Sequence, residues 1–127
     1  MPIRYVIDKE QRIVISTASG VLTFAETKAH QDQLKNDPDF IPEFNQLIDM
    51  TAVTDLATST VEAKIIASRT FFSASSRRAW VAAQPDIFGM GRLMQAHHEM
   101  AEGGSQVCIF YARDPALKWL GVETLQR

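Results

Sequence analysis

Two hydroxyl side chains lie at the start of a predicted helix, at a position where added negative charge would be stabilised. Thr58 comes just before this helix, and Ser59 opens it in a capping-box pair with Glu62. Unpaired backbone N–H groups and the helix dipole favour an anion there. A phosphate on Thr58 or Ser59 would also change the surface charge by about two units. The pair is therefore a candidate phosphoacceptor site; the alternative is helix capping alone, the commoner role of Ser and Thr.

The segment before Thr58 supplies a second group of polar side chains. A strand is predicted over 44–50, followed by a threonine-rich loop over 51–58. In open α/β sheets, ligands bind beyond the C-terminal ends of the strands. The sequence therefore predicts an interaction or ligand loop there, without a glycine-rich phosphate-binding pattern. Its candidate residues are Asp49, Thr51, Thr54 and Asp55.

The histidines do not have the spacing of a metal site. His97 and His98 are adjacent on a predicted helix, so their side chains point about 100° apart and cannot chelate one metal together. We expect His98 to face solvent and His97 to lie on the apolar face, where a hydrogen-bonded core histidine is commoner than a catalytic one. The sequence predicts no metal, no cofactor and no assembled catalytic group.

The same helix carries a methionine-rich stripe. Its apolar side recurs at helical spacing through Met90, Leu93, Met94, His97, Met100 and Ala101. Methionine repacks easily around different shapes. Met90, Met94 and His97 are therefore candidates to line an apolar pocket between this helix and the sheet, for a lipid-like or other small ligand. The alternative is that the stripe only covers the sheet, as every helix of such an architecture must.

These side chains are positioned by a predicted alternation of strands and helices. Strands are predicted over 5–8, 12–16, 44–50, 77–83 and 106–111, and helices over 24–35, 59–75, 87–103 and 116–120. Gly20 is expected to follow the second strand, and Asp114 to cap the last helix. The inner face of the helix over 59–75 is expected to carry Val61, Ile65 and Phe72. The short first gap predicts an antiparallel hairpin, and the rest predicts an α/β fold with a five-stranded, mixed, mostly parallel sheet.

Length and composition limit the class of protein. The chain has 127 residues, which predicts a single domain over 1–127. With 13 basic and 15 acidic residues its net charge is -2, which argues against a dedicated nucleic-acid binder. The N-terminus does not have the pattern of a signal peptide, and no run approaches the roughly 18 apolar residues of a membrane span. The single cysteine, Cys108, cannot form an internal disulfide. We therefore expect a cytoplasmic protein.

The element order and one segment resemble the STAS domain family, in particular the stand-alone bacterial SpoIIAA-like proteins. That family carries Asp-Leu-Ser-Gly-Val, three residues, and then Asp-Ser-Ser-Gly opening a helix. The counterpart here is Asp49-Met50-Thr51-Ala52-Val53, then Thr54-Asp55-Leu56, then Ala57-Thr58-Ser59-Thr60. Asp49, Val53 and Ser59 match, and Thr58 lies where the family has its phosphoacceptor serine. Ala57 and Thr60 replace the family's aspartate and glycine, so the switch motif is degenerate.

The resemblance implies a non-enzymatic regulatory module that contacts another protein, similar to an anti-sigma-factor antagonist. Its partner would be a kinase-like anti-sigma factor or a similar protein, met by the surface around Thr58. The alternative is a small-ligand or lipid-binding module that uses the space between the helix over 87–103 and the sheet. An enzyme ranks third, since no catalytic constellation is apparent. The edge of the N-terminal hairpin also predicts a possible homodimer, because exposed edge strands pair readily.

Overall fold

The computed structural model of the protein describes residues 3–69, 71–99 and 106–122. In these residues, strands and helices alternate after an opening hairpin, as the sequence predicts. The strands are β1 (Ile3–Asp8), β2 (Ile13–Thr23), β3 (Asn45–Ala57), β4 (Arg77–Val81) and β5 (Gln106–Phe110). The helices are α1 (Phe24–Lys35), α2 (Thr60–Ser68), α3 (Pro85–Glu99) and α4 (Arg113–Leu120).

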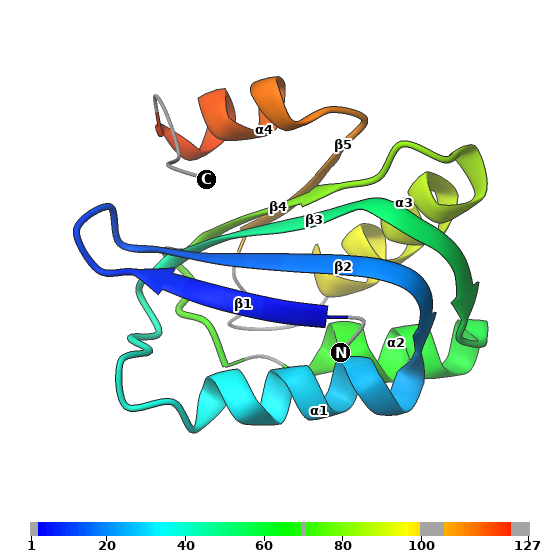
Figure 1. Cartoon of the computed structure of the whole chain (residues 1–127), viewed down its shortest axis with the longest axis horizontal. Helices are drawn as coiled ribbons and strands as arrows, with labels where there is room; N and C mark the ends of the chain where they lie inside the picture. Colours follow the sequence, from blue (N-terminus) through cyan, green and yellow to red (C-terminus); the bar gives the residue numbers. More distant parts are fainter. Residues whose placement is uncertain (1–2, 70, 100–105, 123–127) are drawn as a thin grey trace.

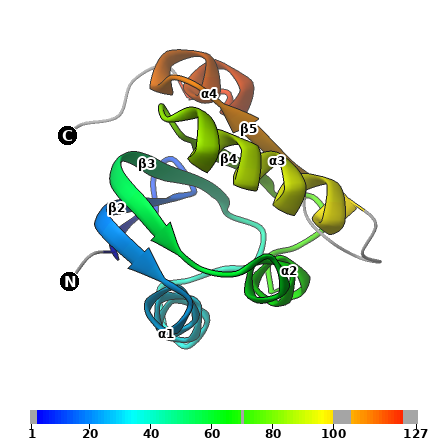
Figure 2. The same ribbon diagram turned by 90° about the vertical axis from the view of Figure 1, so that its right-hand side faces the viewer.

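The described strands form one sheet in chain order, β1-β2-β3-β4-β5. β1 runs antiparallel to β2, and each later strand runs parallel to the one before it. The predicted mixed, mostly parallel sheet is therefore confirmed. Right-handed crossovers between strands in this order place all the connecting helices on one face. Accordingly α1, α2 and α3 cover one face of the sheet, and α4 covers the other (Figure 1, Figure 2).

β2 and β3 are both longer than predicted. β2 passes through Gly20 to Thr23, and β3 continues past Asp49 to Ala57, so the predicted loop over 51–58 is wrong for all but its last residue. The two extensions pair with each other, with register shifts that Gly20 accommodates at a φ of 69°. β3 pairs with β4 only as far as Asp49. Among the described residues, the rest of β3 has no paired strand on its β4 side and is mostly exposed, so it carries polar side chains, as a loop does. Its threonines and its valine nevertheless favour a strand.

The two capping boxes are confirmed, but α2 is shorter than predicted and exposes a different face. Thr23 caps α1 and Ser59 caps α2, each in a reciprocal bond pair with a glutamate at the third helical position. α2 ends at Ser68, not at residue 75. Val61 and Ile65, predicted to point inward, are 68% and 45% exposed, and the buried positions are Ala63, Ile66 and Ala67. Phe72 is buried from the segment after the helix, where it contacts Phe40 and Phe71.

α3 and α4 also differ from the prediction in detail. The buried positions of α3 are Ile87, Gly91 and His98, whereas Met90 and Met94 of the predicted stripe are half-buried and Leu93 is 38% exposed, so the most buried line of the helix is not the predicted stripe. A Cβ at Gly91 would lie 2.6 Å from Ile109 Cδ1, so the absence of a side chain there allows α3 to approach β5. Met100 and Ala101 lie outside the described residues. α4 begins at Arg113, so Asp114 lies inside the helix, and the N-cap, Ala112, makes no side-chain bond.

The two faces of the sheet carry different side chains, because successive residues of a strand point to opposite sides. The face under α4 is apolar, and its buried cluster consists of Ile13, Leu47, Ala79, Val81, Ala116, Leu120 and Val122. The opposite face, under α1 to α3, includes buried polar side chains: Ser16 of β2, Gln46 of β3 and Arg78 of β4. Gln46 and Arg78 are direct neighbours in the β3–β4 pairing.

Candidate ligand-binding site

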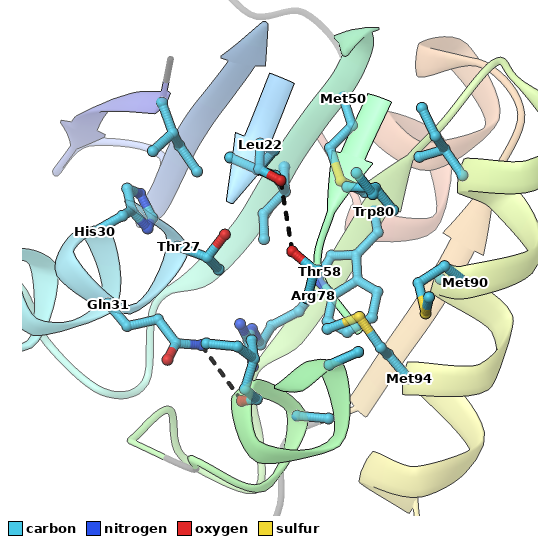
Figure 3. A pocket seen from close by; sticks show the side chains of 18 of the residues that line it. Leu22, Thr27, His30, Gln31, Met50, Thr58, Arg78, Trp80, Met90 and Met94 are labelled. Atoms are coloured by element: carbon cyan, nitrogen blue, oxygen red, sulfur yellow. Dashed lines mark hydrogen bonds between the residues drawn. The ribbon is translucent and has the colours of Figure 1, made fainter. Parts of the chain in front are cut away.

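A cavity of about 90 Å³ lies between the sheet and the three helices α1, α2 and α3. Its walls are mostly apolar, and they include Leu22, Met50, Ile66, Trp80, Met90 and Met94. Figure 3 shows Thr58, Arg78 and Trp80 in the middle of this pocket, with His30 and Gln31 of α1 on one side and Met90 and Met94 of α3 on the other. The pocket is therefore a mainly apolar space with a few polar groups, the usual composition of a small-molecule site.

A chain of hydrogen bonds runs beside the pocket from β4 to α1. Arg78 Nε donates to Gln46 Oε1 at 2.9 Å, and Gln46 Nε2 donates to Ser16 Oγ at 3.1 Å. Ser16 Oγ lies 3.1 Å from His30 Nε2. Because arginine can only donate, the Gln46 amide must present its oxygen to Arg78 and its nitrogen to Ser16. The Ser16 hydroxyl can then donate to a neutral His30, and the orientation of every member is fixed by its neighbour.

Arg78 is a buried cation whose partners among the described residues are neutral. Its side chain is only 5% exposed, and burial lowers the pKa of its guanidinium to about 10, so the group is still charged at neutral pH. The guanidinium carbon lies 4.5 Å from the centre of the Phe72 ring and 5.9 Å from that of Trp80. None of the ion pairs among the described residues includes Arg78. A buried cation without a carboxylate is unusual, because burying a charge without an opposite charge is costly.

His30 is held in its neutral form. It is buried, and burial together with the nearby charge of Arg78 lowers the pKa of His30 to about 4. The Tyr5 ring meets His30 edge-on, with the ring centres 5.5 Å apart. The Tyr5 hydroxyl donates to Asp37 at 2.6 Å, and burial and this carboxylate raise the pKa of Tyr5 to about 12. His30 therefore supplies the pocket with an uncharged polar group at physiological pH.

Trp80 adds a polar group without a partner. Its Nε1 is the one buried side-chain nitrogen or oxygen in the described parts of the chain that lacks a hydrogen-bond partner. Trp80 lines the pocket next to Arg78 on β4. An unsatisfied buried donor costs about 1–3 kcal/mol. Together with Arg78, it makes the polar side of this pocket less completely paired than a packed core normally is.

The two phosphoacceptor candidates have different surroundings. Thr58 is half-buried and lines the pocket, and its Oγ1 donates to the Leu22 carbonyl oxygen at 3.5 Å (Figure 3). Ser59 is exposed, but its Oγ accepts from Glu62 N at 3.1 Å as the helix cap. The capping role of Ser59 is thus confirmed, whereas Thr58 belongs to the wall between the pocket and α2.

The predicted loop residues lie on β3, away from the pocket. Asp49 is paired with Arg113 of α4 at 2.9 Å, on the opposite face of the sheet. Thr51 donates to Asp49 from its backbone nitrogen and from its hydroxyl. Thr54 and Asp55 are exposed on the β3 extension. The structure therefore joins Asp49 and Thr51 but does not bring this group into the cavity.

Only two of the three predicted pocket residues of α3 line the cavity. Met90 and Met94 line the cavity, and His97 does not. His98, predicted to face solvent, is 1% exposed, and its Nδ1 lies 2.9 Å from the Ala67 carbonyl oxygen of α2. The prediction for His98 is wrong because α3 turns the line through Ile87 and Gly91 toward the sheet, and His98 follows that line.

Sequence reasoning missed the polar residues that line the pocket, His30, Gln46 and Arg78, and it missed Ser16, which forms hydrogen bonds with His30 and Gln46 beside the pocket. The signal was present in the strand alternation, since Arg78 and Trp80 are two residues apart and must share a face. Without the sheet register, however, the adjacent Arg77 and Arg78 suggest only a small basic patch. Within the described ranges, no three His, Cys, Asp or Glu side chains gather as metal ligands would. Nor does any helix there have the length and apolar character to span a bilayer.

This arrangement, with its antiparallel first strand and its three helices on one face, is a SpoIIAA-like fold, which confirms the fold expected from the sequence. A solved structure carries the comparison: an uncharacterized protein from the DUF3478 family with a SpoIIAA-like fold, from Shewanella loihica PV-4. The match covers 93% of each chain, with a TM-score of 0.59 and 20% sequence identity, and at this identity it shows the fold alone. No family model matches the chain, and no curated protein matches it.

Proposed function

We propose that this protein is a non-enzymatic binding module whose pocket takes a small, largely apolar ligand. The observation that carries the proposal is the cavity of about 90 Å³ between the sheet and α1, α2 and α3. Protein interiors are close-packed, and spaces larger than a water molecule are few in a domain. Apolar walls with a few polar groups are the usual composition of a small-molecule site, which favours a ligand over a packing defect.

The walls of the pocket support an adaptable apolar ligand. Met50 of β3 and Met90 and Met94 of α3 all line it. Methionine side chains are unbranched and flexible, so they close around ligands of different shape without moving the backbone. Met50 and Met94 are half-buried. The pocket under α3 that the sequence suggested therefore has two of its three predicted residues.

The test uses the methionine methyl groups as reporters, with 1-hexanol as the probe. The chain has five methionines, and three of them line the pocket. In methyl NMR spectra of the full chain, we expect 1-hexanol to shift the signals of Met50, Met90 and Met94 with saturation. Met94→Trp fills the cavity and should abolish the saturable shifts of the other two. Leu93→Trp is the matched control, because Leu93 is the neighbouring residue of α3 and does not line the pocket.

Two results would contradict the ligand proposal. The first is the absence of saturable shifts at Met50, Met90 and Met94. The second is a set of shifts that Met94→Trp leaves unchanged in a variant that melts like the wild type. Native mass spectrometry of freshly purified protein adds a direct readout, a bound small molecule that Met94→Trp loses and Leu93→Trp retains.

A second candidate function, regulation by protein contact, is favoured by the exposed face of α2. Val61 and Ile65 lie one turn apart on this face and are both exposed, next to Thr58. Exposed apolar residues one turn apart on a helix suit a partner with an apolar groove, such as a kinase-like anti-sigma factor. A separate surface, the edge strand β1, would serve pairing with a second copy of the chain.

Phosphorylation of Thr58 would be the switch in this second function. The added phosphate would replace the bond from Thr58 Oγ1 to the Leu22 carbonyl and place negative charge at the start of α2. Incubation with a cognate kinase, followed by mass spectrometry, should then find phosphate on Thr58 and none in Thr58→Ala. Phosphate at other residues alone, or at none, would overturn this role of Thr58.

A further inference from the structure

We propose that the ligand of the pocket carries a carboxylate that pairs with Arg78, attached to a short apolar chain that packs against Met90 and Met94. This inference rests on the proposed ligand-binding function and adds the chemical class of the ligand. It starts from an imbalance of charge. Of the side chains that line the cavity, Arg78 is the one charged group, since His30 is neutral at physiological pH.

The contacts of Arg78 leave room for an anion. The described residues give its side chain one hydrogen bond, from Nε to Gln46 Oε1, and two ring contacts. The other side of the guanidinium carries N–H groups suited to a carboxylate, which accepts two parallel hydrogen bonds from arginine. Figure 3 shows Arg78 in the middle of the pocket, between Gln31 and Trp80, so a ligand entering there meets it.

The charge balance selects a monoanion. With a single cation at the site, a carboxylate gives a neutral buried pair, whereas a phosphate monoester would leave excess negative charge in an apolar cavity. A cationic ligand would be repelled by Arg78. A neutral ligand would leave Arg78 as it is, buried beside the uncharged amide of Gln46 and two aromatic rings. The ordinary rule that buried charges are paired therefore favours an acid.

The size of the space limits the chain. The cavity of about 90 Å³ is smaller than the cavity of about 150 Å³ known to bind benzene, so it holds only part of a six-carbon chain, and the rest of such a chain extends through the open side of the pocket. Met90 and Met94 lie across the pocket from His30 and Gln31, which leaves the apolar tail facing α3 (Figure 3). The class of ligand is therefore a short aliphatic carboxylic acid.

The test compares probes of equal chain length and different head group: hexanoate, 1-hexanol, hexylamine and hexyl phosphate. Isothermal titration of the full chain at pH 7 should give hexanoate at least a tenfold lower dissociation constant than each of the others. Arg78→Met removes the positive charge but leaves an unbranched side chain to fill the space. It should therefore remove this preference, so that 1-hexanol binds as well as hexanoate. Arg77→Met is the matched control, because Arg77 is the neighbouring, exposed arginine of β4 and does not line the pocket, and it should retain the preference for hexanoate.

The outcomes separate this inference from the proposed function. Binding of 1-hexanol as tight as that of hexanoate to the wild type overturns the carboxylate and leaves the apolar pocket standing. Tighter binding of hexyl phosphate also overturns the carboxylate, in favour of a phosphate ester. Failure of every probe overturns both proposals. Should Arg78→Met fail to fold, the ranking of the four probes on the wild type decides the matter alone.

Discussion

The two faces of the sheet both carry buried apolar clusters, but among the described residues only the face under α1 to α3 combines them with a buried polar centre. Under α4, the cluster around Leu47 and Val81 is made of apolar side chains. Under α1 to α3, the central positions of β2, β3 and β4 carry Ser16, Gln46 and Arg78, and a cavity lies next to them. Each strand contributes to both faces, so the backbone is shared and only the alternate side chains differ.

This difference separates stability from binding. Apolar burial is the main source of folding free energy, and the buried cluster under α4 is entirely apolar. A buried cation, an unpartnered Trp80 Nε1 and a cavity all lower stability. The ligand that we propose would account for these features of the polar face. Substitutions that touch one face at a time should therefore have different effects.

The largest expected effect comes from Leu47, which is completely buried in the cluster under α4. Leu47→Ala should lower the free energy of unfolding by about 2–5 kcal/mol, because it leaves a cavity in a packed core. Its neighbour Ile48 points to the other face, is half-buried and lines the pocket. Ile48→Ala is the matched variant and should cost less, since it enlarges an existing space. Urea unfolding of both variants measures the two losses.

Ligand binding should follow the opposite order. A folded Leu47→Ala protein should bind the six-carbon probes as the wild type does, whereas Ile48→Ala should change their affinity. Equal losses of stability in the two variants would break the comparison between the faces.

A smaller effect, and one specific to the polar face, is expected from acid. The pKa of His30 is about 4 in the folded protein and 6.5 in the unfolded chain. The unfolded chain therefore takes up a proton between pH 6.5 and 4 that the folded protein does not bind. Stability from this group is complete above pH 6.5 and is lost as the pH falls, by up to about 3 kcal/mol at pH 4. Urea unfolding from pH 7 to pH 4 measures the loss.

His30→Gln provides the control for this pH dependence. Glutamine is uncharged at every pH and keeps a polar group toward Ser16 Oγ, so its stability curve should lack the His30 contribution. The cluster under α4 contains no titratable side chain and should not add to the slope. A wild-type and a His30→Gln curve of equal slope, or a His30 NMR titration midpoint near 6.5, would contradict this account.

The sequence predicts well what depends on local signals. The capping boxes of Thr23 and Ser59 mark the helix starts to the residue, because the cap and its glutamate are three positions apart. The element order follows from the alternation of apolar runs, and with it the fold. Features that depend on pairing between distant segments are harder to predict. The β3 extension is predicted as a loop because its threonines and its aspartate give it a polar character. Its pairing with β2, and not with β4, depends on contacts between distant segments that the sequence pattern does not show.

The candidate site is predicted less completely for the same reason. Met90 and Met94 are found from helical spacing, but the rotation of α3 that buries His98 depends on the contact of Gly91 with Ile109. Arg78 becomes a pocket residue only through its register with Gln46, and His30 only through the bond to Ser16 that joins α1 to the sheet. These relations lie between elements, where the pattern within one segment carries no information.

The chain order of the strands has a consequence for how the molecule assembles. Each strand pairs with the strand made just before it, so most sheet contacts can form as the chain emerges from the ribosome, in the order of synthesis. The hairpin and β3 supply part of the polar side of the pocket, and β4 completes it with Arg78. α3, which carries Met90 and Met94, arrives next and closes the space, before α4 packs on the other face. The pocket is therefore enclosed late, by the segment that we expect to meet the ligand's tail.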